Sequence, residues 1–340
     1  MQTLTRTLQT FASALALLCI VLVAVPAAAQ TRNSDGSVNP TASAVQEGQL
    51  LQELQRVQGR VSIPDKKEGV LIQPAGRDWR YFHEVTLRWI GGIAILGMLL
   101  LLVGFYLVRG MVRLKSGRSG RTIVRFSAFE RFVHWMTAAC FIILGITGLN
   151  ITFGRPLLMP LMSAEAFTNW SLAAKYAHNF VSFPFTIGVV LIFLMWIAGN
   201  IPNRVDAEWV KRGGGIIGDD HPPAYRFNAG QKMIYWIVVL GGAASAISGY
   251  LLMFPFYGNF TISGMQTVQM VHSIVAVLFV AAMLAHIYIG TIGMEGAFEA
   301  MGTGEVDVNW AREHHSLWLE EEQARARGAA PTGARATPAE

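Results

Sequence analysis

Five long apolar runs constrain this chain more than any other feature of its sequence. Each is long enough to cross a hydrocarbon core of about 30 Å as a helix. They cover Thr86–Val108, Phe132–Ile151, His178–Gly199, Met233–Phe254 and Gln266–Ile292. The chain is 52% hydrophobic and only 14% charged over 340 residues, a composition that argues against an ordinary soluble domain. We therefore predict an all-α integral membrane protein with five crossings.

A shorter apolar run at the N-terminus has the pattern of a secretory signal. Arg6 precedes the run Phe11–Val25, and the small residues Ala27–Ala29 follow it. Small residues after a short apolar run are typical of a cleavage site. We expect residues 1–29 to be a signal peptide, with an uncleaved first helix as the alternative. Residues 30–85 then form a polar, exported and partly flexible segment.

The basic residues are distributed unevenly over the connecting loops. Loop 109–131 contains seven Lys or Arg residues, whereas loop 255–265 contains none. Cytoplasmic loops of membrane proteins carry an excess of Lys and Arg. We predict that loop 109–131 and the tail 293–340 are cytoplasmic and that the N-terminus is periplasmic, in a bacterial inner membrane. This topology also accounts for the net charge of +5, so we expect no nucleic-acid partner.

Two histidines on the last apolar run give the strongest functional signal. His272 and His286 are 14 residues apart (286 − 272 = 14). On a helix they return to within roughly 40° of the same face and stand roughly 21 Å apart in depth. Two imidazoles on one face, near opposite sides of a membrane, suit two stacked haems that each need an axial nitrogen. A lone membrane histidine is more often a packed residue, but candidate partners on other runs favour ligation here.

The predicted topology gives those two histidines partners at the same depth. His134 lies at the cytoplasmic start of the second run, and His178 lies at the periplasmic start of the third. Depth alone pairs His178 with His272 and His134 with His286. An iron held by two imidazoles has no open position, so it is suited to electron transfer. Neither cysteine lies in a C-x-x-C-H motif, so both haems would be of the non-covalent b type.

The other four histidines carry weaker signals. They are His83, before the first apolar run, His221 in the loop DDHPP, and the neighbours His314 and His315 in the tail. For all four we expect surface or interface roles.

From about Arg125 to Glu322 the chain resembles the cytochrome b (gamma) subunit of membrane-bound respiratory formate dehydrogenases. The stretches that carry the resemblance are RFSAFERFVHW, AKYAHNF, YRFNAGQKMIYW, MVHSIVAVLFVAAMLAHIYIGT and EGAFEAMGTGEVDVNWAREHH. All four paired histidines and the loop FNAGQK occur within this region in order. The resemblance implies a four-helix transmembrane haem-binding bundle over 132–292. The chain departs from the simplest members by its long N-terminal extension and the extra helix 86–108, and this leaves open what that helix contacts.

The same resemblance implies cofactors and partners. His134, His178, His272 and His286 match the family's ligands to two b haems. An iron–sulfur beta subunit would dock to this chain and connect it to a molybdenum- or tungsten-pterin alpha subunit that oxidises formate. This chain would hold no formate-oxidising site and would pass electrons to membrane quinone, either menaquinone or ubiquinone. A higher oligomer of the complex fits the same picture.

The resemblance also implies a quinone pocket beside the cytoplasmic haem. Asn228 and Gly230, with His286 nearby, match that pocket. A quinone carbonyl needs a hydrogen-bond donor, which the Asn228 amide or the Gly230 backbone N–H can provide, and Gln231 is a second side-chain candidate. The alternative for Asn228 is a helix N-cap, since asparagine is a preferred capping residue. The two roles are compatible.

The sequence leaves two other classes of function open. The cytochrome b subunit of a nickel–iron hydrogenase or of a thiosulfate reductase would use similar bis-histidine haems. A haem-free membrane anchor or transporter belongs to another class. The stretch GMEGAFEAMGTGEVDVNW favours formate dehydrogenase over the first of these.

Overall fold

The structure is a computed structural model that describes residues 74–215, 222–257 and 260–328. Five helices in this part of the chain are long and apolar enough to cross a membrane. They are Asp78–Arg109, Ala128–Leu157, Ala164–Trp196, Ala229–Met253 and Ser263–Gly293. They follow the predicted runs in order, which confirms the all-α membrane fold. The predicted signal peptide and most of the predicted exported segment lie outside the described residues.

The last four long helices each begin at a side chain that accepts a hydrogen bond from the first helical turn, which is the usual chemistry of a helix start. They are α5 (Ala128–Leu157) after Ser127, α6 (Ala164–Trp196) after Ser163, α8 (Ala229–Met253) after Asn228 and α9 (Ile262–Tyr288) after Thr261. These caps explain why the helices begin several residues before the predicted apolar runs. The cap at Ser163 starts α6 well before His178, so that histidine lies inside the helix rather than at its start.

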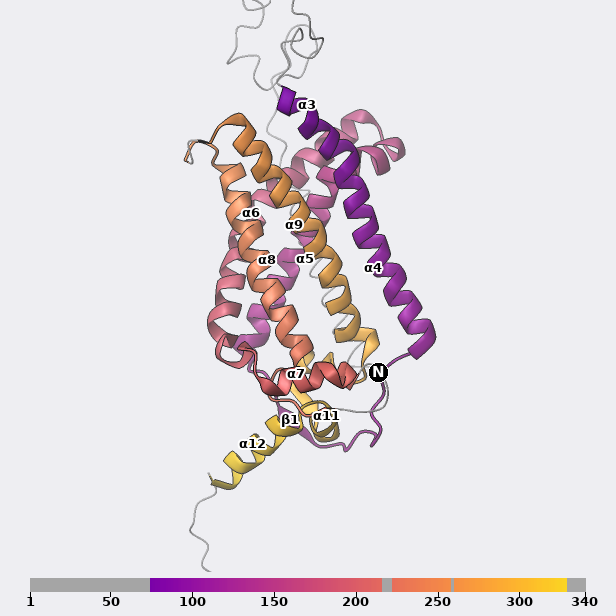
Figure 1. The fold of residues 1–340 in the computed structure, drawn as a ribbon, viewed down its shortest axis with the longest axis vertical. Coiled ribbons are helices and arrows are strands. Elements are labelled where there is room, and N and C mark those ends of the chain that lie inside the picture. Colours follow the sequence, from indigo (N-terminus) through magenta and orange to yellow (C-terminus); the bar gives the residue numbers. More distant parts are fainter. Residues whose placement is uncertain (1–73, 216–221, 258–259, 329–340) are drawn as a thin grey trace, which may run out of the picture.

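The four capped helices form the bundle, and the first long helix lies outside it. α5 packs on α6, α8 packs on α9, and α6 contacts α8. Helix α3 (Pro74–Tyr81) and a π-helical turn (Phe82–Thr86) lead into α4 (Leu87–Arg109), which packs mainly on α9 (Figure 1). The arrangement therefore matches the predicted bundle of four with one extra helix.

The extra helix approaches the bundle closely at one glycine. A Cβ atom on Gly91 would lie 3.0 Å from Phe153 Cζ on α5 and 3.3 Å from Val277 Cγ1 on α9. Nearby, Arg88 Nε donates a hydrogen bond to the Thr152 carbonyl over 3.3 Å. Gly91 thus lets α4 contact both α5 and α9, which answers what this helix packs against within the chain.

Segments 110–127 and 293–328 fold together at one end of the bundle, and we call this unit the end cap. Strand β1 (Thr122–Val124) pairs antiparallel with β2 (Glu305–Asp307). The other elements are a π-helical turn over Ile289–Gly293 that leads in from α9, and α10 (Glu299–Gly302), α11 (Val308–His314) and α12 (Ser316–Gly328). Two 3-10 turns (Ala198–Asn200 and Gly213–Gly215) flank the short helix α7 (Arg204–Lys211) at the same end (Figure 1). The predicted loop and most of the predicted tail are therefore folded structure.

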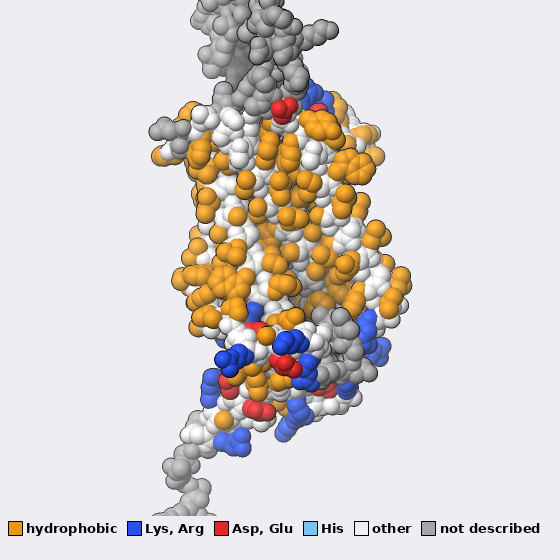
Figure 2. Space-filling view, in the orientation of Figure 1, with side chains coloured by type: hydrophobic (Ala, Val, Ile, Leu, Met, Phe, Trp, Pro, Cys, Tyr) orange, Lys and Arg blue, Asp and Glu red, His pale blue; other side chains and the backbone are white. Residues whose placement is uncertain are grey.

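The end cap continues the hydrophobic core of the bundle. Val306, Trp310 and Trp318 are almost fully buried and pack in one cluster with Val133 of α5 and Trp196 of α6. Most of the Lys and Arg side chains visible in Figure 2 lie at this end, next to a broad band of apolar side chains. The structure thus has an apolar body, built of helices long enough to cross a membrane, and a charged end formed by the end cap.

Candidate functional site

The four predicted histidines come together as two pairs at two levels of the bundle. His178 on α6 faces His272 on α9, with ring centres 6.2 Å apart and ring planes at 74°. His134 on α5 faces His286 on α9, also with ring centres 6.2 Å apart, and ring planes at 61°. These are the two pairs that depth predicted from the sequence.

The spacing within each pair has the dimension of a metal ion held between two imidazoles. A metal–imidazole nitrogen bond is about 2.0 Å long and the ring centre lies roughly 1.1 Å behind that nitrogen, so two opposed ligands have centres roughly 6.2 Å apart. Among the described residues no cluster of three or more His, Cys, Asp or Glu side chains is arranged to hold a metal ion. Paired histidines without further ligands fit a haem, whose porphyrin supplies the other four positions, and do not fit a bare metal ion.

Hydroxyl groups orient both histidines of the first pair. His178 Nδ1 lies 2.8 Å from Thr147 Oγ1, and His272 Nδ1 lies 2.9 Å from Ser248 Oγ. A metal-ligating histidine commonly uses its second ring nitrogen in such a bond, because the bond fixes the ring orientation. In each ring the bonded nitrogen is Nδ1, which leaves Nε2 as the nitrogen for a ligand.

In the second pair, His134 lacks the corresponding bond. His134 Nδ1 is buried and has no hydrogen-bond partner among the described residues. The ring stacks edge-on against its neighbour Trp135 at 5.1 Å between ring centres. The two pairs therefore share their spacing and differ in their surroundings.

A layer of three phenylalanines lies midway between the two pairs. Phe141, Phe185 and Phe279 each stand seven residues, or about two helical turns, beyond His134, His178 and His272 respectively. Their ring centres lie 4.8 Å (Phe141–Phe279), 6.3 Å (Phe141–Phe185) and 6.5 Å (Phe185–Phe279) apart. Packed aromatic rings therefore lie between the two histidine levels. The repeated interval of seven residues is visible in the sequence and is the signal that could have predicted this layer.

The predicted quinone residues lie at the start of α8. Asn228 forms a capping box: its side-chain oxygen accepts from Gln231 N over 2.9 Å, and Asn228 N donates to Gln231 Oε1 over 3.1 Å. The N-cap alternative for Asn228 is thus present in the structure. The amide nitrogens Nδ2 of Asn228 and Nε2 of Gln231 take no part in this box. The ring of Trp209 on α7 covers Gly230, where a Cβ atom would lie 3.2 Å from Trp209 Cη2.

The remaining histidines lie outside the two pairs. His83 is stacked on Trp79, with ring centres 5.4 Å apart, at the start of the extra helix. His221 lies outside the described residues. The expectation of surface or interface roles is wrong for His314 and His315, which are 8% and 1% exposed. The sequence did not show that the tail folds back against the bundle, so these two residues looked exposed.

His315 is part of a buried cluster around Arg125. The Arg125 guanidinium carbon lies 5.2 Å from the ring centre of Trp310 and 4.9 Å from that of Trp318. Arg125 Nη2 lies 3.1 Å from His315 Nε2, and His315 Nδ1 lies 2.7 Å from the Tyr225 carbonyl. Since arginine can only donate and a carbonyl can only accept, His315 accepts at Nε2 and donates from Nδ1. The neutral ring thus joins the two segments of the end cap to each other and to the loop that leads into α8.

Acid should loosen this cluster. Burial, with the neighbouring Arg125 cation, lowers the pKa of His315 well below its ordinary value, and burial with Arg226 lowers the pKa of Arg125 to about 9. When the segment that carries His315 detaches from the cluster, His315 takes up a proton below about pH 6.5, whereas the buried His315 does not. The attachment of this segment therefore weakens as pH falls, by at most about 1.4 kcal/mol per pH unit. We expect limited proteolysis of α12 to speed up from pH 7.5 to 5.5.

The matched control is His315→Gln, which can accept from Arg125 and donate to Tyr225 without titrating. Its proteolysis rate should change less with pH than that of the unaltered chain. Equal pH profiles for the two proteins would contradict the role of His315.

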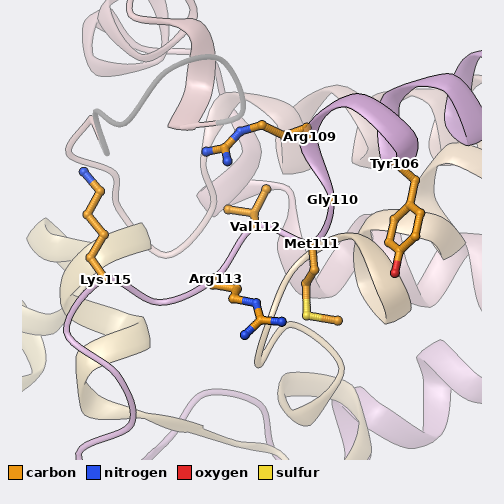
Figure 3. Close-up of a pocket in the computed structure, with 7 residues that line it drawn as sticks. All are labelled: Tyr106, Arg109, Gly110, Met111, Val112, Arg113 and Lys115. Carbon is orange, nitrogen blue, oxygen red and sulfur yellow. The ribbon is translucent and has the colours of Figure 1, made fainter.

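Two surface pockets lie apart from the histidine pairs. One, of about 540 Å³, is lined by residues 106–115 where α4 ends, and the other, of about 510 Å³, is lined by aromatic and aliphatic residues between Ile247 and Tyr257. In the first pocket the side chains of Arg109, Arg113 and Lys115 leave the chain in different directions (Figure 3). Because these cations do not converge, we assign no ligand to this pocket.

Comparison with known proteins identifies the region that holds the pairs. The family described as prokaryotic cytochrome b561 matches residues 125–304, a little over half of the chain. This region contains all four paired histidines and begins after α4. The match supports haem b as a cofactor of this region.

Curated relatives give the same result. The chain is 30% identical over 203 residues to the formate dehydrogenase cytochrome b556(fdo) subunit of Escherichia coli strain K12, covering 59% of this chain and 93% of that protein. It is 26% identical over 207 residues to the nitrate-inducible formate dehydrogenase cytochrome b556(Fdn) subunit of the same strain, covering 59% and 92%. The formate dehydrogenase cytochrome b556 subunit of Haemophilus influenzae is 26% identical over 208 residues, covering 59% and 83%. The chain therefore belongs to the prokaryotic cytochrome b561 family of multi-pass, haem b-binding membrane proteins, among the cytochrome b subunits of formate dehydrogenases.

Proposed function

We propose that this chain is the dihaem electron conduit of a formate dehydrogenase complex, carrying electrons from formate oxidation across the membrane to quinone. The observation that carries the proposal is the presence of two histidine pairs, each with ring centres 6.2 Å apart, at two levels of one bundle. Each haem b would carry one electron at a time between its two oxidation states. A bundle with one such pair would hold an electron without conveying it across.

The protein's own part in this function is to hold the two levels apart and keep water out between them. His272 and His286 are 14 residues apart on α9, which a helix converts to roughly 21 Å. The layer of Phe141, Phe185 and Phe279 lies between the two levels. An apolar, packed layer gives protons no hydrogen-bonded path, so electrons can cross while protons stay on their own side.

We propose an orientation in the bacterial inner membrane with the N-terminus periplasmic and the C-terminus cytoplasmic. The seven Lys and Arg residues of loop 109–131 support it, because such residues are enriched on the cytoplasmic side. The gathering of basic side chains at the end cap supports it as well. His178 and His272 then form the periplasmic pair, where electrons enter, and His134 and His286 form the cytoplasmic pair.

Quinone reduction belongs at the cytoplasmic pair in this proposal. The capping box uses the Asn228 side-chain oxygen and leaves its Nδ2 group available as a donor. Gly230 N–H lies in the first turn of α8, where backbone donors have no helical acceptor. Gln231 Nε2 is a further donor. Each of these three groups is a candidate donor to a quinone carbonyl, and protons would come from the cytoplasm.

Formate oxidation itself would take place in partner subunits. The curated relatives are named as subunits of formate dehydrogenases, and this supports a complex for the present chain. We propose an iron–sulfur beta subunit at the periplasmic face and a molybdenum- or tungsten-pterin alpha subunit beyond it. The hydrogenase and thiosulfate reductase alternatives share the bis-histidine geometry and are separated by the electron donor.

A reduced-minus-oxidised spectrum of membranes that contain the complete complex tests the proposal. Formate should reduce b-type haem, and added quinone should reoxidise it. Reduction by hydrogen but not by formate would assign the chain to a hydrogenase. Reoxidation by thiosulfate would indicate a thiosulfate reductase, and the absence of any haem signal would indicate a haem-free anchor.

A further inference from the structure

The same three-residue pattern faces each histidine of the periplasmic pair. In Ile146-Thr147-Gly148 on α5 the last two residues lie against His178, and in Ile247-Ser248-Gly249 on α8 the last two lie against His272. The two segments come from different hairpins of the bundle, α5–α6 and α8–α9. Each pairs a hydroxyl residue with a glycine in the order Ile-(Thr/Ser)-Gly. The pair of histidines is thus held in two matched cradles.

The hydroxyl groups determine which ring nitrogen carries the proton. Thr147 Oγ1 lies 2.7 Å from the Ile143 carbonyl, and Ser248 Oγ lies 2.6 Å from the Ala244 carbonyl. These are ordinary O–H···O distances, so each hydroxyl donates its one proton to the preceding turn. Each hydroxyl oxygen therefore accepts from the imidazole, and Nδ1 is the protonated nitrogen. The lone pair on Nε2 is left for a metal.

The glycines let the imidazole rings come close to the opposite helix. A Cβ atom at position 148 would lie 3.4 Å from His178 Cε1, and one at position 249 would lie 3.2 Å from His272 Cε1. The first distance is ordinary contact and the second is tight. A Cβ atom at position 249 would crowd the His272 ring, whereas one at position 148 would just meet the His178 ring. The hydroxyl and the glycine thus act on the same ring, one as an acceptor and the other by leaving room.

We propose that these two cradles make the periplasmic haem the lower-potential of the two. An imidazole whose Nδ1–H is accepted by an oxygen is a more basic ligand, and a more basic ligand stabilises the oxidised iron. At the cytoplasmic pair, His134 Nδ1 is buried with no partner among the described residues. Electrons that enter at the periplasmic side would then move downhill to the cytoplasmic pair. This inference rests on the proposed dihaem function and assigns Thr147 and Ser248 as positioning residues.

An optical redox titration of the intact complex tests the inference. Thr147→Val and Ser248→Ala should each raise the potential of the lower-potential component and leave the other unchanged. The reduction equilibrium of that component should shift by up to about tenfold, since a free-energy difference of about 1.4 kcal/mol is a factor of ten. Thr147→Ser and Ser248→Thr, which keep the hydroxyl, should titrate like the unaltered chain.

The matched control is Thr267→Val on α9. Thr267 is exposed and makes the same bond to its own helix, with Oγ1 lying 3.1 Å from the Ser263 carbonyl, but no imidazole contact. The Thr267→Val variant should leave the potentials of both haems unchanged. If Thr147→Val does not assemble, Thr147→Cys replaces it, because a thiol is a weaker acceptor than a hydroxyl.

Unchanged potentials in Thr147→Val and Ser248→Ala, with both haems retained, would overturn the inference. A shift confined to the higher-potential component would overturn it too. Fewer than two haems in the unaltered chain would refute the dihaem function instead, so the two failures are distinguishable.

Discussion

His272→Ala should lower the haem content from two per chain to about one. The change removes one of the two imidazoles that face each other across 6.2 Å in the periplasmic pair. The pair His134 and His286 is untouched, so its haem should remain. His286→Ala should do the reverse, removing the cytoplasmic haem and leaving the periplasmic one. The measurement is the number of haems extracted per protein chain in each variant.

His83→Ala is the control for this experiment. His83 is stacked on Trp79 at the start of the extra helix, outside both pairs. It should keep both haems. If either His272→Ala or His286→Ala retains two haems per chain, the ligand assignment is wrong.

Asn228→Ala should leave both haems reducible by formate and slow their reoxidation by quinone. One lost hydrogen bond, worth about 0.5–1.5 kcal/mol, corresponds to a roughly 2- to 13-fold loss of quinone affinity. The alanine also removes the side-chain oxygen that caps α8 over 2.9 Å. Losing such a cap costs about 0.5–2 kcal/mol of stability. Reoxidation rates and protein yield must therefore be measured together.

Asn228→Asp and Asn228→Ser separate the two roles. Both keep an oxygen that can accept from Gln231 N, and neither has the amide donor. They should restore the yield while reoxidation stays slow. Reoxidation at the unaltered rate in both variants would show that Asn228 serves as a helix cap and makes no contact with quinone.

The number and order of the membrane helices could be predicted from the sequence because each apolar run is a local property. The pairing of the histidines could be predicted as well. Alternating crossings assign each residue a depth. At each of the two depths there are only two of the four histidines, and they come from different helices. The helix limits were less accurate. Side chains such as Ser163 start a helix outside the apolar run, where hydropathy gives no signal.

The contacts that orient the histidines could not be predicted in the same way. Thr147 reaches His178 from another helix, 31 residues away, and Ser248 reaches His272 over 24 residues. Which residues of two neighbouring helices meet depends on helix rotation, which depth does not specify. The burial of His315 depends on the tail folding back onto the bundle, and no local pattern in the tail indicated this.

The haem-to-protein ratio of the purified, unaltered chain tests the central claim most directly. The geometry of the two histidine pairs predicts two b-type haems per chain, each released without breaking a covalent bond to the protein. A ratio of one would mean that one pair is a packed pair of histidines with no iron between them. A ratio of one or of zero would contradict the proposed path across the membrane.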